Sequence, residues 1–168
     1  MKGGSRVLLD IKMKKIVIMS DNHGDQTMID YVKEHEPHGD YYIHCGDSEA
    51  IDKRILNGFI YVKGNNDWAL DFPKEARIIV EDIPILITHG QYFGYFNREL
   101  AMNDLLTRRQ CQILISGHTH MPMFQKDGSF YYVNPGSTTF PRGGSARSYA
   151  VLTIDHGKVD FQLKEIEK

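Results

Sequence analysis

Five short apolar runs along the chain each end abruptly in a cluster of polar residues. The runs cover residues 16–19, 41–45, 59–63, 85–88 and 113–116, and the clusters after them are Ser20-Asp21-Asn22-His23-Gly24, Gly46-Asp47, Gly64-Asn65-Asn66-Asp67, His89-Gly90 and Gly117-His118-Thr119-His120. Continuous apolar runs of this length are typical of buried strands. Each predicted strand therefore delivers polar side chains at its carboxyl end.

Helical patterns fit several of the intervals between these strands. Asp25 and Asn97 are predicted to cap two of the helices. The side chains expected to face inward are Met28, Ile29 and Val32 in the first helix and Leu100, Ala101 and Leu105 in the second. A further helix is expected from about residue 49 to 56. Alternating strands and helices indicate an α/β fold, in which ligands gather outside the carboxyl ends of the strands.

The remaining segments follow the pattern of antiparallel hairpins, because short apolar runs flank tight polar turns. The predicted strands cover residues 77–81, 123–125, 130–133, 149–154 and 159–163. Two mixed sheets packed face to face, with helices outside, are the simplest assembly. We expect one domain over residues 13–168, and we expect residues 1–12 to be a poorly ordered extension.

Composition and charge narrow the classes of function. The 20 basic and 22 acidic side chains nearly cancel, so the chain has no general field to attract long nucleic acid. No apolar run approaches the length of about 18 residues that a membrane-spanning helix needs. Cys45 and Cys111 lie far apart and form no CxxC motif, which favours a reducing compartment. We therefore expect a cytoplasmic protein.

The residues at the strand ends form a plausible ligand set for two metal ions. Phosphate ester hydrolysis needs a nucleophile at neutral pH and positive charge beside the phosphoryl oxygens, and two ions about 4 Å apart supply both. Our hypothesis assigns Asp21, His23, Asp47 and His120 to one ion and Asp47, Asn65, His89 and His118 to the other, with Asp47 bridging. Alone, each motif also fits an ordinary turn or core residue. Their coincidence at five strand ends favours the metal centre.

The ligand types indicate which ions the centre would take. No cysteine is among the ligands, and mixed oxygen and imidazole ligation suits an open catalytic site. We expect two divalent ions, and these ligands suit Mn, Fe, Ni or Zn. The other histidines, His35, His38, His44 and His156, are interpreted as structural. Arg142 and Arg147 lie in a glycine-rich loop and are candidates for a phosphate clamp, with solvated surface residues as the alternative.

These motifs resemble the calcineurin-like metallophosphoesterase superfamily over roughly residues 14–165. The short chain and Val133-Asn134-Pro135-Gly136-Ser137 are similar to its small YfcE-type phosphodiesterase branch. The resemblance implies a four-layer αββα sandwich, Mn-supported cleavage of small phosphodiesters by a water or hydroxide that bridges the metals, and the ligand roles given above. Small members of this family often associate, which leaves a homo-oligomer open.

One position departs from the broader superfamily. Larger members carry a histidine directly after the metal-binding asparagine, where this chain has Asn66. An amide cannot deliver a proton to a leaving alkoxide as an imidazolium can, but its N–H can stabilise charge. Asn66, His89 and His118 are the residues that we expect to take part in catalysis.

Two other functions fit the same sequence. The first is a phosphomonoesterase or nucleotide pyrophosphatase that uses the same site. The second is a non-catalytic scaffold, because the fold also resembles the small retromer subunit, a protein-interaction component. A scaffold would be expected to tolerate loss of ligands, and all seven candidate ligands are present in this chain.

Overall fold

The computed structural model describes residues 13–167 and contains two mixed sheets of five strands each. The first has the order β10-β9-β1-β2-β3 and the second the order β4-β5-β6-β8-β7. The strands of the first sheet are β1 (Met13–Met19), β2 (Tyr41–His44), β3 (Phe59–Tyr61), β9 (Ser148–Asp155) and β10 (Lys158–Glu165). Those of the second are β4 (Glu75–Val80), β5 (Ile83–Thr88), β6 (Ile113–Ile115), β7 (Pro122–Asp127) and β8 (Phe130–Pro135).

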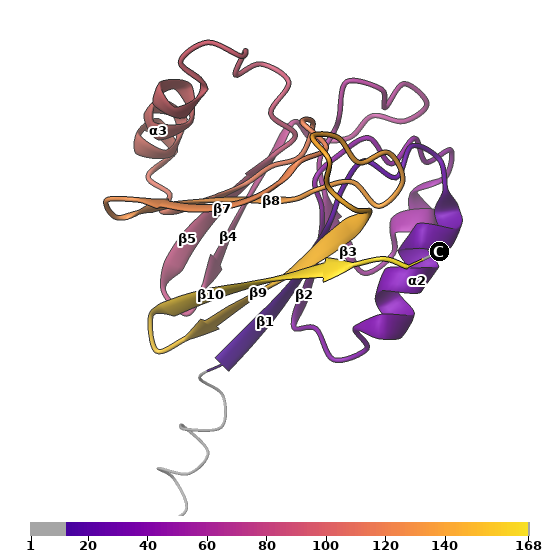
Figure 1. The fold of residues 1–168 in the computed structure, drawn as a ribbon, viewed down its shortest axis with the longest axis horizontal. Helices are drawn as coiled ribbons and strands as arrows, with labels where there is room; N and C mark the ends of the chain where they lie inside the picture. The colour runs from indigo at the N-terminus through magenta and orange to yellow at the C-terminus, as the bar shows by residue number, and fades with distance from the viewer. Residues whose placement is uncertain (1–12, 168) are drawn as a thin grey trace, which may run out of the picture.

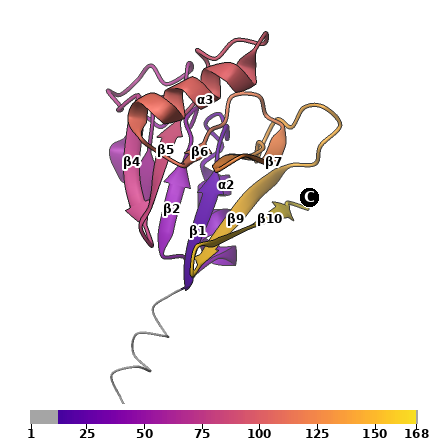
Figure 2. The ribbon, with the colours of Figure 1, turned by 90° about the vertical axis from the view of Figure 1, so that its left-hand side faces the viewer.

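The two sheets pack face to face between two helices, α2 (Gln26–His35) and α3 (Arg98–Arg109), as Figures 1 and 2 show. Alternation along the strands builds these layers, because successive side chains point to opposite faces. In β1, Ile16 and Ile18 join the core between the sheets, whereas Val17 and Met19 pack in the cluster that includes α2. The α3 helix covers the outer face of the second sheet. The predicted four-layer αββα sandwich is confirmed.

The parallel strands bring the polar clusters together. Strands β1, β2 and β3 are parallel in the first sheet, and β5 is parallel to β6 in the second. These five strands are the ones predicted to end in polar residues. Their carboxyl ends lie at one edge of each sheet, and hydrogen bonds join the loops across the two edges: the backbone N–H of His118 donates to Asp21 Oδ2 over 3.1 Å.

The helix predicted over residues 49–56 is wrong in extent. Only a short 3₁₀ helix, η1 (Lys53–Leu56), forms there. Glu49 adopts a left-handed conformation with φ of 52°, and its backbone N–H donates to Asp67 Oδ1 over 2.8 Å. The residues before η1 are therefore held by the loop after β3 and are not free to form a helical turn.

The orientation predicted for the second helix is also wrong in part. Leu100 is 66% exposed, and the side chains that α3 buries are Met102, Leu105 and Leu106. Asn97 precedes the helix in a left-handed conformation and makes no side-chain capping bond. The first helix agrees with its prediction, because Asp25 accepts a hydrogen bond from the backbone of Thr27.

Two further predictions concern the ends of the chain and the membrane. Residues 1–12 lie outside the described part of the chain, so the predicted extension stays a prediction. Within residues 13–167, no helix combines the length and apolar character needed to cross a membrane.

A pair of leucines on α3 tests the packing of the helix. Replacing buried Leu106 by alanine is expected to lower the free energy of unfolding by about 2–5 kcal/mol, because it removes a fully buried side chain and leaves a cavity. Replacing exposed Leu100 by alanine is expected to change it by less than about 0.5 kcal/mol. Denaturant unfolding of both variants measures the difference, and equal losses would contradict the observed orientation of α3.

Candidate metal centre

All seven predicted ligands meet at the shared edge of the two sheets. The loops that carry them are unusually bent, since Asp21, His23, Asp47, His118 and His120 all have positive φ angles, between 45° and 71°. Positive φ is uncommon outside glycine and costs on the order of 1–3 kcal/mol for each residue. The sequence patterns did not predict this strain. Five of the eleven non-glycine residues with positive φ among residues 13–167 are candidate ligands, which supports a functional role for this edge.

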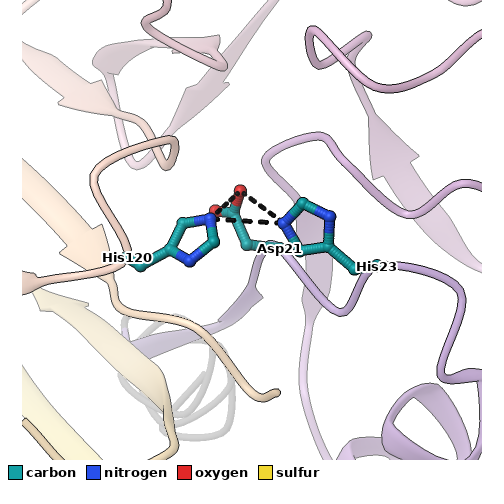
Figure 3. Close-up of side chains that lie close together, drawn as sticks. All are labelled: Asp21, His23 and His120. Atoms are coloured by element: carbon teal, nitrogen blue, oxygen red, sulfur yellow. Dashed lines mark hydrogen bonds and ion pairs between the residues drawn. The ribbon is translucent and has the colours of Figure 1, made fainter. Parts of the chain in front are cut away.

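Asp21, His23 and His120 form the first cluster (Figure 3). His120 Nε2 lies 3.2 Å from Asp21 Oδ1 and 3.2 Å from His23 Nε2. His23 Nε2 also lies 3.8 Å from Asp21 Oδ1. Asp21 follows β1, His23 lies two residues later, and His120 follows β6. The cluster therefore joins one loop from each sheet.

Asp47, Asn65, His89 and His118 form the second cluster. His89 Nε2 lies 3.3 Å from Asp47 Oδ2 and 3.0 Å from Asn65 Oδ1. His118 Nδ1 lies 3.1 Å from the same Asn65 oxygen. Asp47 Oδ2 is also 3.8 Å from His23 Nε2 of the first cluster. Asp47 Oδ2 thus lies near histidines of both clusters, and so does Asp21 Oδ1, which is 3.7 Å from His89 Nε2. The bridging role of Asp47 stays a prediction.

Hydrogen bonds fix the ring nitrogens that face the centre. His89 Nδ1 lies 2.7 Å from the Cys45 carbonyl, and His120 Nδ1 lies 2.7 Å from the Phe140 carbonyl. A carbonyl oxygen only accepts, so Nδ1 carries the proton in both rings and Nε2 keeps its lone pair. His23 Nδ1 lies 2.9 Å from Glu49 Oε2, which selects the same tautomer. Three imidazole lone pairs therefore point into the centre.

Asp21 provides the test of whether a cation fits. Its Oδ2 atom accepts from the Ser20 hydroxyl over 2.6 Å and from the His118 backbone over 3.1 Å. Its Oδ1 atom is buried and has no hydrogen-bond donor among the described residues. Burying a carboxylate oxygen without a donor is costly, and lone pairs of His23 and His120 converge on the same point. Divalent cations offset both unfavourable features, so these residues fit a metal ion.

The electrostatics agree with an anionic site. Burial raises the pKa of the Asp21 carboxyl, but His120, His89 and Ser20 outweigh it and hold that pKa below its ordinary value. The pKa of Asp47 is likewise lowered despite burial, through His89 and the hydrogen bonds from Asn66. Both carboxylates are therefore ionised at neutral pH.

The histidines respond to these carboxylates. Burial lowers the pKa of His89, but Asp47 and Asp21 raise it above its ordinary value. Contact with Asp21 raises the pKa of His120. Burial and His89 lower the pKa of His118. Protons therefore compete with metal most strongly at His89 and His120.

Asp67 holds the loops in place, a role that the sequence analysis missed. Its buried carboxylate accepts hydrogen bonds from the backbone N–H groups of Asp47, Glu49 and Gly64, over 2.7–2.9 Å. A Cβ atom at Gly64 would collide with the Asp47 carboxylate, so only glycine fits there. The Gly-Asn-Asn-Asp motif contained this signal, since its Asp follows the ligand Asn65 by two residues.

Asn66 lies beside the proposed bridging carboxylate. Its backbone N–H donates to Asp47 Oδ1 over 2.8 Å, and its side-chain amide donates to Asp47 Oδ2 over 3.0 Å. These bonds orient the candidate bridging carboxylate. Asn66 is therefore placed to position Asp47, in addition to any contact with substrate.

The remaining candidates lie outside the two clusters. Arg142 is exposed, and the Arg147 guanidinium donates to the Glu167 carbonyl over 3.4 Å. Three of the four histidines interpreted as structural, His35, His38 and His156, are exposed. The fourth, His44, is fully buried next to the centre, where Nδ1 accepts from the Gly46 backbone and Nε2 donates to Asn22 Oδ1.

Comparison with known proteins gives the family. The calcineurin-like phosphoesterase superfamily domain matches residues 13–157. The probable metallophosphoesterase YsnB of Bacillus subtilis is 33% identical over 143 residues, covering 84% of this chain and 85% of its own. The phosphodiesterase YfcE of Escherichia coli K12 is 31% identical over 150 residues, covering 83% and 72%. The chain belongs to the calcineurin-like phosphoesterase superfamily, which confirms the predicted metallophosphoesterase class.

Solved structures agree on the fold. A conserved protein of Streptococcus pneumoniae TIGR4, described as a predicted phosphoesterase, has a TM-score of 0.82 and 30% identity, covering 92% of this chain and 93% of its own. Vacuolar Protein Sorting 29 of Cryptosporidium parvum has a TM-score of 0.73 at 16% identity, covering 93% and 99%. This second likeness concerns the fold alone.

His44 makes the stability of the protein depend on pH. Burial lowers its pKa to about 4 from the ordinary value of 6.5. Between these values the unfolded chain binds a proton that the folded protein does not, so stability is complete above about pH 6.5 and falls as the pH approaches 4. The loss due to His44 is on the order of 3 kcal/mol.

The variant His44→Gln isolates this contribution, because glutamine does not titrate. We expect the wild-type advantage in free energy of unfolding over the variant to be largest above pH 7 and to shrink towards pH 4. Denaturant unfolding of both proteins without added metal measures it. An advantage that stays constant over this range would show that His44 is not held neutral by the fold.

Proposed function

We propose that the protein is a dinuclear metal-dependent phosphodiesterase that hydrolyses small phosphodiesters. The observation that carries the proposal is the position of Asp47 Oδ2, 3.3 Å from His89 Nε2 in one cluster and 3.8 Å from His23 Nε2 in the other. A carboxylate that lies between the two sets of ligands would offset part of the repulsion between two cations. The ligands proposed are Asp21, His23, Asp47, Asn65, His89, His118 and His120.

Two divalent ions at these residues would supply a nucleophile at neutral pH and neutralise the charge that develops on the phosphoryl group. The donors are oxygen and imidazole nitrogen, which suits Mn, with Fe, Ni or Zn also compatible. Relatives that are named as metallophosphoesterases support metal dependence. The choice of Mn rests on the ligand chemistry and the family resemblance.

The chain's own residues prepare the site for this reaction. The Cys45 and Phe140 carbonyls and the Glu49 carboxylate hold the rings of His89, His120 and His23 with Nε2 facing inward. Asn66 orients Asp47 through two N–H groups. A leaving alkoxide finds no imidazole directly after Asn65, so we infer that solvent protonates it. His89 is fully buried, which suits a ligand, whereas His118 is partly exposed and could also contact substrate.

Diesters are preferred in the proposal because of the relative named as a phosphodiesterase. A phosphomonoesterase or nucleotide pyrophosphatase would use the same ligands, and turnover of matched monoesters and diesters separates these classes. The complete ligand set favours an enzyme over a scaffold. Cys45 and Cys111 are buried free thiols, which supports a cytoplasmic enzyme.

The variant Asp47→Asn tests the proposal. It keeps the shape of the side chain but removes the charge that a bridging ligand needs. We expect metal-dependent hydrolysis of bis(p-nitrophenyl) phosphate to fall by about two orders of magnitude or more, since several kcal/mol of stabilisation are lost. Steady-state kinetics with added Mn measures this loss.

The control is Asp30→Asn, which removes one negative charge from the exposed face of α2. We expect this variant to retain wild-type activity. Thermal unfolding of both variants checks that they are folded. Undiminished metal-dependent hydrolysis by folded Asp47→Asn would overturn the site assignment.

A further inference from the structure

A cleft lies beside the candidate metal centre. Its volume is about 390 Å³, and its lining residues include Asn65, Trp68, Tyr92, Lys63 and Lys74. Asn65 belongs also to the second ligand cluster, where its Oδ1 lies 3.0 Å from His89 Nε2. Asn65 therefore places the cleft next to the second ligand cluster.

Trp68 is an exposed aromatic side chain that lines this cleft. It directly follows Asp67, which is 2% exposed and whose carboxylate is fixed by three backbone N–H groups. The Trp68 side chain itself is 84% exposed, and no aromatic ring of the described residues stacks on it. A large apolar ring held out in solvent beside a catalytic site is available to stack on a ligand.

Tyr92 presents a second aromatic side chain in the same cleft. It is 79% exposed and lies in the loop that begins at the ligand His89 and Gly90. Tyr92 and Trp68 form no ring contact with each other among the described aromatic pairs. Neither ring is covered by another aromatic ring among the described residues.

Two lysines add positive charge to the cleft. The Lys63 backbone N–H donates to the Pro73 carbonyl over 2.7 Å, which closes the loop and brings residue 74 near residue 63. The Lys74 carbonyl accepts from the Thr88 hydroxyl over 3.2 Å. Neither ammonium group forms an ion pair with a described residue. Both charges are therefore available to a ligand anion such as a phosphate.

We propose that this cleft binds the nucleobase of a nucleotide substrate, with the base stacked on Trp68 and the phosphates between the lysines and the metal centre. The inference rests on the proposed phosphodiesterase function and narrows its substrate class to base-bearing phosphodiesters. Stacking of one base on an aromatic side chain contributes about 1–3 kcal/mol. That range corresponds to a preference of roughly 5- to 150-fold over an ester that lacks the base.

A single tryptophan makes direct measurement possible, since Trp68 is the only one in the sequence. Adenosine 5′-monophosphate serves as the probe, because it carries a purine and the phosphate of a hydrolysed diester. We expect saturable quenching of Trp68 fluorescence by this probe and much weaker quenching by ribose 5-phosphate, which has the phosphate without the base. The titrations are run with Mn and again with chelator.

Variants locate the binding. Tyr92→Ala and Lys63→Ala are expected to lower the affinity for adenosine 5′-monophosphate, measured by fluorescence quenching, by about fivefold or more. Phe96→Ala is the matched control, because Phe96 is 93% exposed in the same loop and does not line the cleft. It should leave the affinity for the probe at the wild-type value.

Kinetics of Trp68→Ala give a second measurement. The substrates are the p-nitrophenyl ester of thymidine 5′-monophosphate and methyl p-nitrophenyl phosphate, which share a leaving group. We expect the ratio of their kcat/KM values to fall by about 5-fold or more in the variant, mainly through KM.

The outcomes separate this inference from the proposed function. Equal quenching by adenosine monophosphate and ribose 5-phosphate, or an unchanged kcat/KM ratio, overturns the base site even if diesters are hydrolysed. Base-dependent quenching in a protein that hydrolyses neither ester supports the binding site and overturns the proposed function instead.

Discussion

The Asp21 carboxylate links the loops of the two sheets at the site. It also has one buried oxygen that no donor among residues 13–167 satisfies, which favours a bound cation. Its Oδ2 atom receives hydrogen bonds from Ser20, next to it in the first sheet's loop, and from the His118 backbone in the second sheet's loop. Its Oδ1 atom faces the imidazole nitrogens of His23 and His120 without a donor. One oxygen thus fixes the geometry of the edge, and the other is the candidate anionic ligand.

The cost of this geometry is distributed over the loops. Five of the proposed ligands adopt positive φ angles, and such residues persist only where the surrounding structure determines them. Here that support comes from the core between the sheets and from the Asp67 carboxylate, which holds three backbone N–H groups. Substituting the supporting residues would therefore disturb ligand positions without touching a ligand.

The fold and the clustering of the candidate ligands were largely predictable from sequence, because both depend on strand periodicity. Runs such as 16–19 and 85–88 identify parallel strands, and the polar residues after them must meet at the carboxyl edges. The orientation of α3 was not predictable in the same way, since Leu100 and Leu106 are equally apolar. The helix predicted near residue 49 failed because the Asp67 carboxylate, distant in sequence, captures the Glu49 N–H.

Sequence patterns could not predict the hydrogen bonds and side-chain neighbours that form between residues distant in sequence. Loop geometry determines the roles of Asp67 and Glu49. It also brings Trp68 and Asn65 into one cleft. The local pattern of apolar and polar residues predicts none of these features. Motifs thus locate the chemistry, whereas the contacts around the motifs determine the tautomers, the strain and the substrate cleft. The proposed base-binding cleft depends on these contacts between loops.

The central claim is that these residues hold two ions with Asp47 between them. Anomalous X-ray diffraction from crystals grown with Mn measures the number and positions of the ions directly. We expect two Mn peaks about 4 Å apart, with Asp47 in contact with both. A single peak, or two peaks that Asp47 does not join, would contradict it.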